Sequence, residues 1–154
     1  MSLGFSSGEQ ELDRFLYKSV PQYHENNAGI TYVAVHVDKP ELILGYHYFC
    51  AAALPHDTLG AQKLTHTHHY PVLKFHTLAV DSRQKKKGIG ALLFFEGLDA
   101  AHRAAPIIGL HGVYFEALDS ARTFYSEYLG LKPIAPSKTK FFLSIDDIAR
   151  LLAA

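Results

Sequence analysis

The sequence has few of the features of an exported or membrane-spanning protein. It contains one cysteine, Cys50, among 154 residues, and a single thiol cannot form an intramolecular disulfide framework. No segment approaches the roughly 20 consecutive apolar residues of a membrane-spanning helix. The N-terminus also lacks a continuous apolar stretch of signal-peptide length. We therefore expect a cytoplasmic protein with no membrane partner, in which Cys50 is a small core residue.

The sequence also lacks an excess of either charge. Fifteen Lys and Arg residues balance fifteen Asp and Glu residues, so no overall field draws the protein toward nucleic acid or membrane. The composition, 48% apolar and 19% charged, is that of an ordinary folded protein. A chain of this length has room for one domain with a sizeable core. We find no internal repeat and no low-complexity linker, and we predict a single domain over residues 1–154.

Histidine is the residue type present in excess, with ten copies. These side chains add positive charge mainly below about pH 6.5. His66 and His68 alternate along the chain, so on a strand they would share a face. No third ligand follows at the spacing of a zinc site, and Asp57 is far away in sequence. We therefore expect solvated loop histidines here, and no metal site.

Hydrophobic periodicity and turn residues predict ten helices and strands. Ser6 or Ser7, followed at a distance of three by Glu9 or Gln10, indicates a capping box at the start of the first helix. Pro106 is expected to end the helix that follows the central strand. The predicted elements are helical turns within 6–27, strands 31–37, 43–54 and 72–80, a helix from 88 to 102 or 103, strand 110–116, a helix from 119 or 120 to 129, strands 131–135 and 140–143, and helix 146–152.

The most informative stretch lies between the predicted strand 72–80 and the helix that begins near residue 88. It reads Lys-Lys-Lys-Gly-Ile-Gly over residues 85–90. A tight glycine turn at a helix start aims several backbone N–H groups at one point, where the helix dipole adds partial positive charge. The loop therefore predicts an anion site, and phosphate is the anion we expect. The three lysines fit a direct phosphate role and a solvated surface run equally well.

The glycine spacing excludes two common phosphate motifs. A P-loop needs four residues between its glycines and then Gly-Lys-Ser/Thr, and the dinucleotide fingerprint needs a third glycine where Leu93 stands. The loop instead resembles the acetyl-coenzyme A loop of the GNAT N-acetyltransferases, Gln/Arg-x-x-Gly-x-Gly/Ala. Lys85 replaces the first residue of that pattern, and Lys86 stands where many members have a further glycine.

A second motif resembles the same family. Ala121, Phe124-Tyr125 and Leu129-Gly130-Leu131 are similar to the late GNAT helix, with Leu131 in place of the final Phe. The resemblance implies the GNAT fold, an α/β (α+β) architecture with a mixed, mostly antiparallel central sheet flanked by helices. It also implies acetyl-coenzyme A as co-substrate and an amine as acceptor. In the family, a tyrosine at the position of Tyr125 is the usual candidate for protonating the departing thiolate.

Further site residues follow from these two motifs and from the strands beside them. Glu116 ends a predicted strand and His76 lies on the central one, so each is a candidate general base, either directly or through water. Both have simpler explanations, because a carboxylate at the end of a strand is commonly solvated and a lone strand histidine is usually satisfied within the structure. Tyr128 is expected to pack. The residues expected to contact the cofactor are Leu78, Ala79, Val80, Lys85, Lys86, Lys87, Gly88, Ile89, Gly90 and Phe124.

A narrower resemblance covers nearly the whole chain. The opening segment 5–16 looks like the first helix of the GNAT toxins of bacterial toxin–antitoxin pairs, and segments 31–35, 78–81 and 117–119 continue the likeness. Those toxins acetylate the α-amine of aminoacyl-tRNA, commonly dimerise and are held by a ribbon-helix-helix antitoxin. Two departures are Thr77, where many toxins carry Arg, and the neutral net charge, since a protein that grasps tRNA tends to be basic. The alternatives are acetylation of a small-molecule or protein amine, or a non-catalytic module that binds acyl-coenzyme A.

Overall fold

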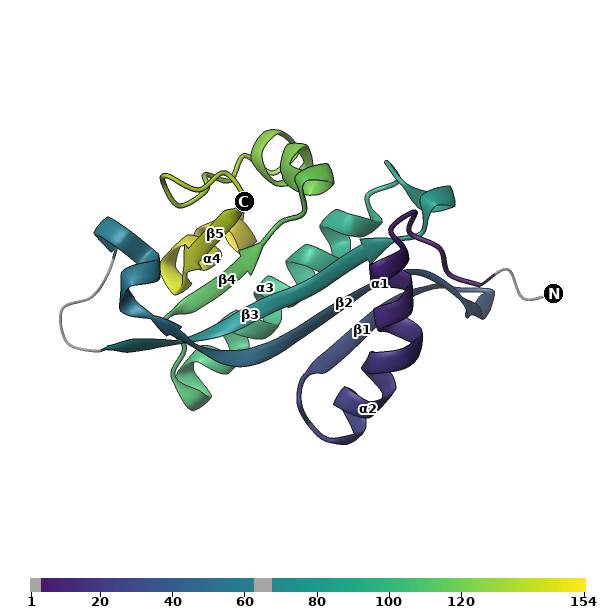
Figure 1. Cartoon of the computed structure of the whole chain (residues 1–154), viewed down its shortest axis with the longest axis horizontal. Helices are drawn as coiled ribbons and strands as arrows, with labels where there is room; N and C mark the ends of the chain where they lie inside the picture. The colour runs from purple at the N-terminus through teal and green to yellow at the C-terminus, as the bar shows by residue number, and fades with distance from the viewer. Residues whose placement is uncertain (1–3, 63–67) are drawn as a thin grey trace. The chain divides into compact units, whose positions relative to one another are not determined.

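The computed structural model describes residues 4–62 and 68–154 (Figure 1). These residues fall into two compact units, each described here by itself. Unit 1 comprises residues 1–50 and 75–97, and unit 2 comprises residues 51–74 and 98–154. The elements are α1 (Gln10–Arg14), α2 (Val20–Glu25), β1 (Ile30–His36), β2 (Lys39–Pro55), β3 (His69–Val80), α3 (Ile89–Ile108), β4 (Gly112–Glu116), β5 (Lys140–Ser144) and α4 (Ile145–Ala153).

One five-stranded sheet has the order β1-β2-β3-β4-β5. The pairs β1–β2 and β4–β5 are antiparallel. Backbone bonds from His56 N to His68 O and from Asp81 N to Leu44 O join opposite ends of β2 and β3, so this pair is antiparallel as well. α3 connects β3 to β4 as a crossover, which is the connection that parallel neighbours require. The predicted mixed, mostly antiparallel sheet is confirmed.

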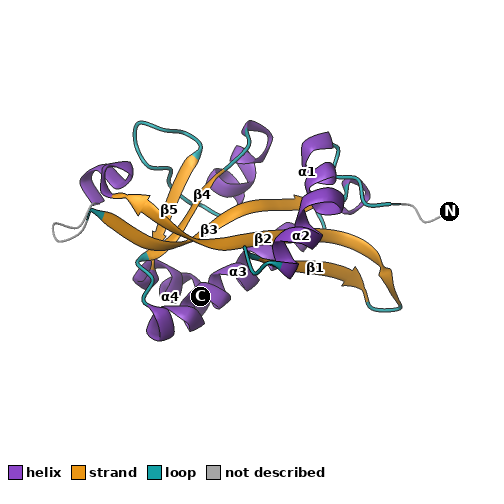
Figure 2. Ribbon diagram, turned by 60° about the horizontal axis from the view of Figure 1, so that its bottom comes forward, coloured by secondary structure: helices purple, strands orange, loops and turns teal. Residues whose placement is uncertain are grey.

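In unit 1, residues 45–49 of β2 are buried on both faces because helices cover both sides of the strand there (Figure 2). Tyr46 and Tyr48 pack with Leu16 and Val20 of the N-terminal helical segment. The alternate residue His47 faces the other way and contacts the first half of α3. Successive strand residues point to opposite faces, so an uninterrupted buried run is the pattern that a two-sided sheet produces.

In unit 2, the antiparallel pair β4–β5 carries a core cluster on one face and an aromatic cluster on the other. Tyr114 and Phe142 share the first cluster with residues of β2, β3 and the 3-10 segment His56–Gln62. Phe115 and Phe141 stack on the opposite face, with ring centroids 5.0 Å apart. α4 packs on both strands, and its Ile148 is fully buried.

Two predicted helix signals were wrong. Ser7 does not cap α1 through a capping box; its hydroxyl accepts a bond from Glu9 N and donates one to Asp13 Oδ1, and the N-cap residue Glu9 makes no side-chain cap bond. Pro106 does not end α3, which continues to Ile108. Gly109 ends it instead, with φ of 74° and its N–H bonded to Ala105 O. A left-handed glycine after the last turn is a common helix stop.

The late part of the chain also departs from the prediction. The segment predicted as one helix is helical from Asp119 to Tyr128, but it begins as a 3-10 turn, Asp119–Ala121, and ends as a π-helical turn, Phe124–Tyr128. The predicted cap at Asp119 or Ser120 was wrong, because the N-cap residue is Leu118 and it makes no side-chain cap bond. Residues 131–135 form no strand in the described structure. Ile134 N donates to Lys140 O, but β5 takes β4 as its strand partner. The capping box at Ser144 is confirmed, with Asp147 as its second member.

Within the described residues, no helix is both long and apolar enough to cross a membrane.

Candidate active site

The loop that joins β3 to α3 has the backbone geometry of an anion-binding turn. After a short 3-10 turn, Ser82–Gln84, Lys86 and Gly88 both adopt the left-handed region, with φ of 63° and 84°. Helix α3 begins directly after this loop, and its first backbone hydrogen bond runs from Leu92 N to Gly88 O. The N–H groups of residues 89–91 therefore precede that bond and lack an intrahelical acceptor, as at any helix start. They point out of the N-terminus of a 20-residue helix, where an anion is stabilised.

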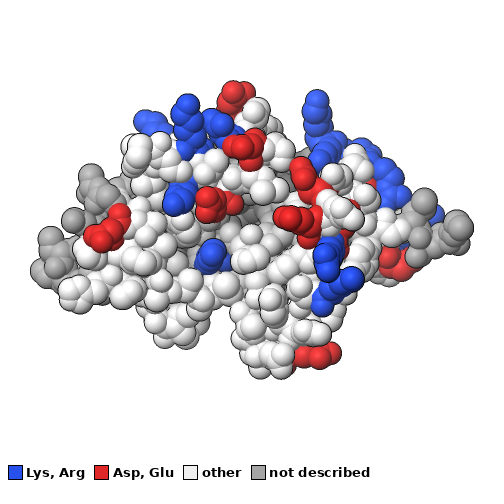
Figure 3. Space-filling view, viewed as in Figure 1, with Lys and Arg blue, Asp and Glu red and all other residues white. Residues whose placement is uncertain are grey.

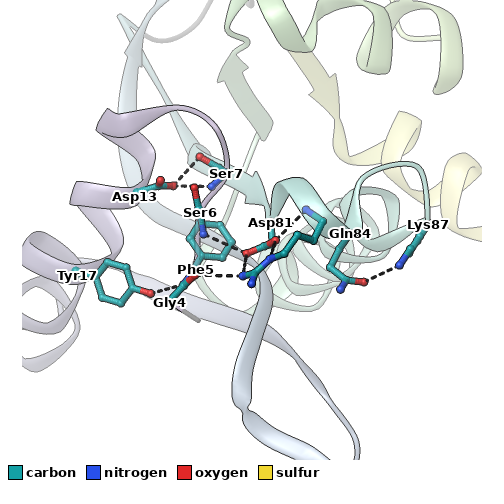
Figure 4. Close-up of polar contacts among 10 residues, drawn as sticks. Gly4, Phe5, Ser6, Ser7, Asp13, Tyr17, Asp81, Gln84 and Lys87 are labelled. Carbon is teal, nitrogen blue, oxygen red and sulfur yellow. Dashed lines mark hydrogen bonds and ion pairs between the residues drawn. The ribbon is translucent and has the colours of Figure 1, made fainter. Parts of the chain in front are cut away.

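A buried carboxylate fixes the start of this loop (Figure 4). Asp81 is 1% exposed, and its oxygens accept bonds from Ser6 N at 3.1 Å and from Arg83 N at 2.9 Å. The Arg83 side chain closes on the same carboxylate through Nε at 2.8 Å and Nη2 at 2.7 Å. These hydrogen bonds from Arg83 hold the pKa of Asp81 well below its usual range, although burial opposes the shift. The carboxylate therefore stays charged at neutral pH.

The same group ties the loop to the N-terminal segment of unit 1. Arg83 Nη2 also donates to Gly4 O at 3.1 Å, and Ser82 N donates to Ser6 O at 2.8 Å. Sequence analysis placed Asp81 in a family-like segment but gave it no role. The available signal was a single acidic residue directly after a buried strand, followed two residues later by arginine.

The start of α3 is seated against β2 at a glycine. A Cβ added to Gly45 would lie 3.0 Å from Ala79 O, 3.0 Å from Leu93 Cδ1 and 3.1 Å from Ile89 Cγ2. Such contacts are tighter than ordinary van der Waals packing. The absence of a side chain at Gly45 therefore lets the first turns of the helix and the end of β3 approach the strand closely.

Four exposed basic residues surround the loop: Arg83, Lys85, Lys86 and Lys87. Figure 3 shows blue side chains gathered over this part of the chain. Lys87 Nζ lies 3.3 Å from Gln84 Oε1, a contact within the loop that leaves the ammonium group exposed. The loop is thus strongly basic in a protein whose net charge is zero.

The remaining candidates of unit 1 lie on β3. Leu78 and Val80 are half-buried and Ala79 is buried. His76 is exposed, stacks on Phe15 with ring centroids 5.1 Å apart, and its Nδ1 lies 2.7 Å from Thr77 Oγ1. His76 therefore lies on the sheet face that carries the N-terminal helices, within an aromatic cluster.

The candidate acid Tyr125 belongs to unit 2 and is buried. Its ring packs against Phe115 and Phe141, with centroids 4.7 Å and 5.7 Å away, and edge-to-face against Phe124 at 5.0 Å. Burial raises the pKa of the Tyr125 hydroxyl above its ordinary value. The hydroxyl therefore keeps its proton at neutral pH, which is the state that a proton donor needs.

Glu116 lies on the other face of β4 from Tyr125. It alternates with Phe115, which contacts Tyr125, and shares its face with Tyr114. Glu116 is exposed, and the residue opposite it in the register is Lys140. The structure thus separates this candidate base from the candidate acid by the thickness of the β4–β5 pair.

His47 is a residue whose importance sequence analysis missed. It is fully buried in unit 1, lies 4.5 Å from Phe75 between ring centroids, and its Nδ1 lies 3.1 Å from Leu93 O. The Leu93 carbonyl can only accept, so Nδ1 carries the hydrogen. Nε2 has no hydrogen-bond partner among the described residues. Burial lowers the pKa of His47 to about 4, so the ring is neutral in the folded protein.

This neutral histidine predicts a loss of stability in weak acid. The pKa of His47 rises to about 6.5 on unfolding. Below pH 6.5 the unfolded state therefore binds more protons than the folded state. The free energy of unfolding decreases as the pH is lowered from about 6.5 to about 4. We expect His47 to lower the free energy of unfolding by about 2 kcal/mol between pH 7 and pH 5. Urea unfolding of the wild type and of His47→Asn at both pH values measures this. Equal pH dependence in the two proteins would contradict the assignment.

The histidines after β2 form no metal site in the part of the chain that the structure describes. His56 Nε2 lies 2.9 Å from Asp57 Oδ1, and the rings of His56 and His68 are 6.1 Å apart. His66, the other residue of the predicted alternation, lies outside the described residues.

The chain is similar in sequence and structure to known acetyltransferase toxins. No protein-family model matches. A tRNA-acetylating toxin of Mycobacterium tuberculosis (strain ATCC 25618 / H37Rv) is 29% identical over 126 residues, which cover 80% of this chain and 74% of the relative. The structure of AtaT complexed with acetyl-methionyl-tRNAfMet has a TM-score of 0.83 at 26% identity and covers 96% of this chain and 89% of that chain.

Two further structures agree. A mutant AtaT toxin bound to acetyl-CoA and to the C-terminus of the antitoxin AtaR has a TM-score of 0.79 at 25% identity, covering 97% of this chain and 89% of that chain. A mutant of KacT has a TM-score of 0.88 at 24% identity, covering 97% and 90%, and supports the fold alone. The glycine loop at the start of α3, the sheet order and these likenesses together show the GNAT fold, in a chain that is similar to the acetyltransferase toxins of bacterial toxin–antitoxin systems.

Proposed function

We propose that this protein is an acetyl-CoA-dependent N-acetyltransferase that acetylates the α-amine of aminoacyl-tRNA and thereby blocks translation. The observation that carries the cofactor assignment is the loop 85–90, with Lys86 and Gly88 in the left-handed region directly before a long helix. A coenzyme A diphosphate fits the N–H groups at that helix start. The acceptor assignment is supported by the relatives, which include a tRNA-acetylating toxin and a complex with acetyl-methionyl-tRNA.

The pantetheine arm requires main-chain groups that the sheet leaves unpaired. β3 has twelve residues and β4 has five, so β4 is too short to pair with the whole of β3. In this proposal Leu78, Ala79 and Val80, the last residues of β3, offer backbone groups to the arm and polarise the thioester carbonyl. Lys85, Lys86, Lys87, Gly88, Ile89 and Gly90 take the diphosphate, mainly through the main chain. Phe124 is a further residue that we propose to contact the cofactor.

The reaction is a direct acyl transfer. The neutral amine nitrogen attacks the thioester carbonyl carbon, a C–N bond forms, the C–S bond breaks and the nitrogen passes a proton to solvent water. The departing thiolate takes a proton from the hydroxyl of Tyr125, which burial keeps protonated, and solvent water returns a proton to Tyr125 before the next turnover. An aminoacyl ester has a more acidic ammonium than a peptide terminus, whose pKa is about 7.7–8.0. Enough of it is neutral at physiological pH that neither His76 nor Glu116 needs to act as a strong base.

The proposal is tested by supplying acetyl-CoA with aminoacyl-tRNA, with free amino acids and with peptides, while thiol release is followed. Turnover that depends on charged tRNA supports the toxin assignment. Turnover with small amines or peptides alone would assign a different acceptor. Tight binding of acetyl-CoA in isothermal titration without any turnover would instead indicate a non-catalytic acyl-CoA-binding module.

The likeness to AtaT, which is solved with its antitoxin AtaR, extends the proposal to a partner. We expect a ribbon-helix-helix antitoxin to hold this protein in the cytoplasm. A small neighbouring reading frame that encodes such a protein, and co-purification of the two products, would support this. Failure of the co-expressed pair to associate would contradict it.

A homodimer is the remaining part of the proposal, and β1 is the surface that supports it. β1 is the edge strand of the sheet, and its residues Ile30–His36 include no Asp, Glu, Lys or Arg. Ile30, Tyr32, Val33 and Val35 are all exposed. An edge strand with exposed apolar residues and no charged residue to block pairing tends to pair with another strand. A second copy of β1 meets no like charge in an antiparallel pair.

We expect Val33→Lys to convert the dimer into a monomer, because a lysine in an edge strand opposes pairing. Light scattering after size exclusion should give twice the 17.1 kDa chain mass for the wild type and one chain mass for the variant. Val37→Lys, in the turn that follows β1 and 88% exposed, is the matched control and should remain dimeric. A monomeric wild type, or a dimeric Val33→Lys, would contradict this interface.

A further inference from the structure

Tyr128 was expected to pack, but the structure exposes it. Its side chain is 68% exposed, an unusual state for a large aromatic residue. It stacks on Phe124, with ring centroids 5.6 Å apart and an interplanar angle of 18°. Phe124 in turn contacts the buried ring of Tyr125 edge-to-face. A continuous line of three aromatic rings thus leads from the candidate acid to the surface of unit 2.

The backbone holds this line of rings in place. Phe124 and Tyr128 are the first and last residues of the π-helical turn. Leu129 N donates to Phe124 O and Leu131 N donates to Tyr125 O, each at 3.0 Å. The main chain that carries these rings is therefore held by hydrogen bonds, as the support of a stacking platform must be.

The chain around this turn is locally basic. Residues 118–140 contain four basic and two acidic side chains, although the protein as a whole is neutral. Lys132 and Lys138 are exposed, and Figure 3 shows blue side chains gathered over the 132–140 segment. The acidic Asp119 lies 3.8 Å from Arg122, and Glu127 is exposed. An exposed aromatic ring in a locally basic stretch of chain is a combination with which proteins bind single-stranded nucleic acid.

We propose that Tyr128, backed by Phe124, is the platform on which the 3′-terminal adenine of an aminoacyl-tRNA stacks, with Lys132 and Lys138 meeting the phosphates of the single-stranded acceptor end. This inference rests on the proposed function and assigns its acceptor a subsite. The terminal adenosine carries the aminoacyl ester on its ribose. A base held on the outer ring therefore brings the α-amine toward the end of the aromatic line at which Tyr125 lies. Adenine is also part of coenzyme A, so the test separates the two sources.

Removing the Tyr128 ring should weaken the binding of tRNA and leave the binding of acetyl-CoA unchanged. We expect Tyr128→Ala to raise the KM for aminoacyl-tRNA about tenfold, since stacking of one base is worth roughly that factor or more. Its Kd for acetyl-CoA in isothermal titration should not change. Tyr128→Phe keeps the π-face and should restore the wild-type KM. Lys132→Ala should raise the same KM and reduce its dependence on salt, whereas the exposed Lys18→Ala on the other unit should not.

A binding measurement makes the inference testable even if turnover fails. Wild-type protein should bind uncharged tRNA about tenfold more tightly than tRNA that lacks its 3′-terminal adenosine, and Tyr128→Ala should bind the two equally. A shift in acetyl-CoA affinity with unchanged tRNA affinity would assign the platform to the cofactor adenine and overturn the proposal. Unchanged affinity for both ligands would overturn it as well. Discrimination of the 3′ end without any acetyl transfer would support the platform and refute the enzyme.

Discussion

We expect Tyr125→Phe to lower kcat at least about 100-fold, with little change in the Michaelis constant for either substrate. The variant removes one hydroxyl from a ring that is buried against Phe115 and Phe141. Ring packing is retained, so binding should be preserved. In the proposed mechanism, the variant loses the proton that the departing thiolate takes in the transition state, and a group that acts only there changes kcat and kcat/KM equally.

The pH profile provides a second readout for Tyr125. Because burial raises the pKa of its hydroxyl, ionisation of Tyr125 should cause no loss of kcat up to about pH 9, where an exposed tyrosine with a pKa near 10 begins to ionise. Tyr128→Phe is the matched control, since it removes a hydroxyl from an exposed neighbour on the same turn, and it should retain wild-type kcat. If Tyr125→Phe turned over at the wild-type rate, the proton donor would be another group.

We expect Gly88→Asp to weaken acetyl-CoA binding by about 100-fold or more. The residue has φ of 84°, and an added Cβ would meet nothing within 4 Å, so steric overlap with the protein contributes nothing. Two effects remain. The left-handed backbone is strained for any residue with a side chain, and the carboxylate lies at the helix start where the diphosphate is expected, so that two negative charges compete for the same N–H groups.

Two controls separate these effects. Gly88→Ala introduces the strain without the charge and should weaken binding only severalfold. Gly109→Asp introduces the same charge at the other end of the same helix, also at a positive φ of 74° with no atom within 4 Å of an added Cβ. It should leave acetyl-CoA affinity unchanged in isothermal titration. Wild-type affinity in Gly88→Asp would remove this loop from the cofactor site.

The sheet and the loop could be predicted because their signals are local. The β-branched and aromatic run of β1 and the apolar run of β3 specify strands directly. A Gly-x-Gly pair after a buried strand specifies a turn and a helix start. The structure adds that Lys86 itself has a positive φ, which explains why a glycine suits this position in related loops.

Other predictions failed because tertiary contacts overrode local signals. Ser7 has the right spacing for a capping box, but its hydroxyl donates a hydrogen bond to the carboxylate of Asp13 instead. Pro106 lies close to the end of α3, where a missing N–H costs one hydrogen bond, and the helix absorbs this loss. The segment after Leu131 has strand-like residues, but Lys140 onward pairs with β4 instead.

The roles of the buried carboxylate Asp81 and the buried His47 could not be predicted from the sequence for a different reason. Asp81 receives bonds from Ser6, 75 residues away, and His47 bonds to Leu93, 46 residues away. Partners this distant are brought together only by the fold. The position of Glu116 also depends on the fold. Its neighbour Phe115 packs against Tyr125, so Glu116 points to the opposite face of β4.

In the proposed reaction, acetyl-CoA delivers its acetyl group to the α-amine at the end of a charged tRNA. The most direct measurement incubates the purified protein with acetyl-CoA labelled in the acetyl group and with aminoacyl-tRNA, then counts label in the tRNA and free thiol in solution. We predict one thiol released for each acetyl group found on the α-amine, and no label on uncharged tRNA. Acetyl-CoA that binds but is never transferred to any aminoacyl-tRNA would contradict the claim.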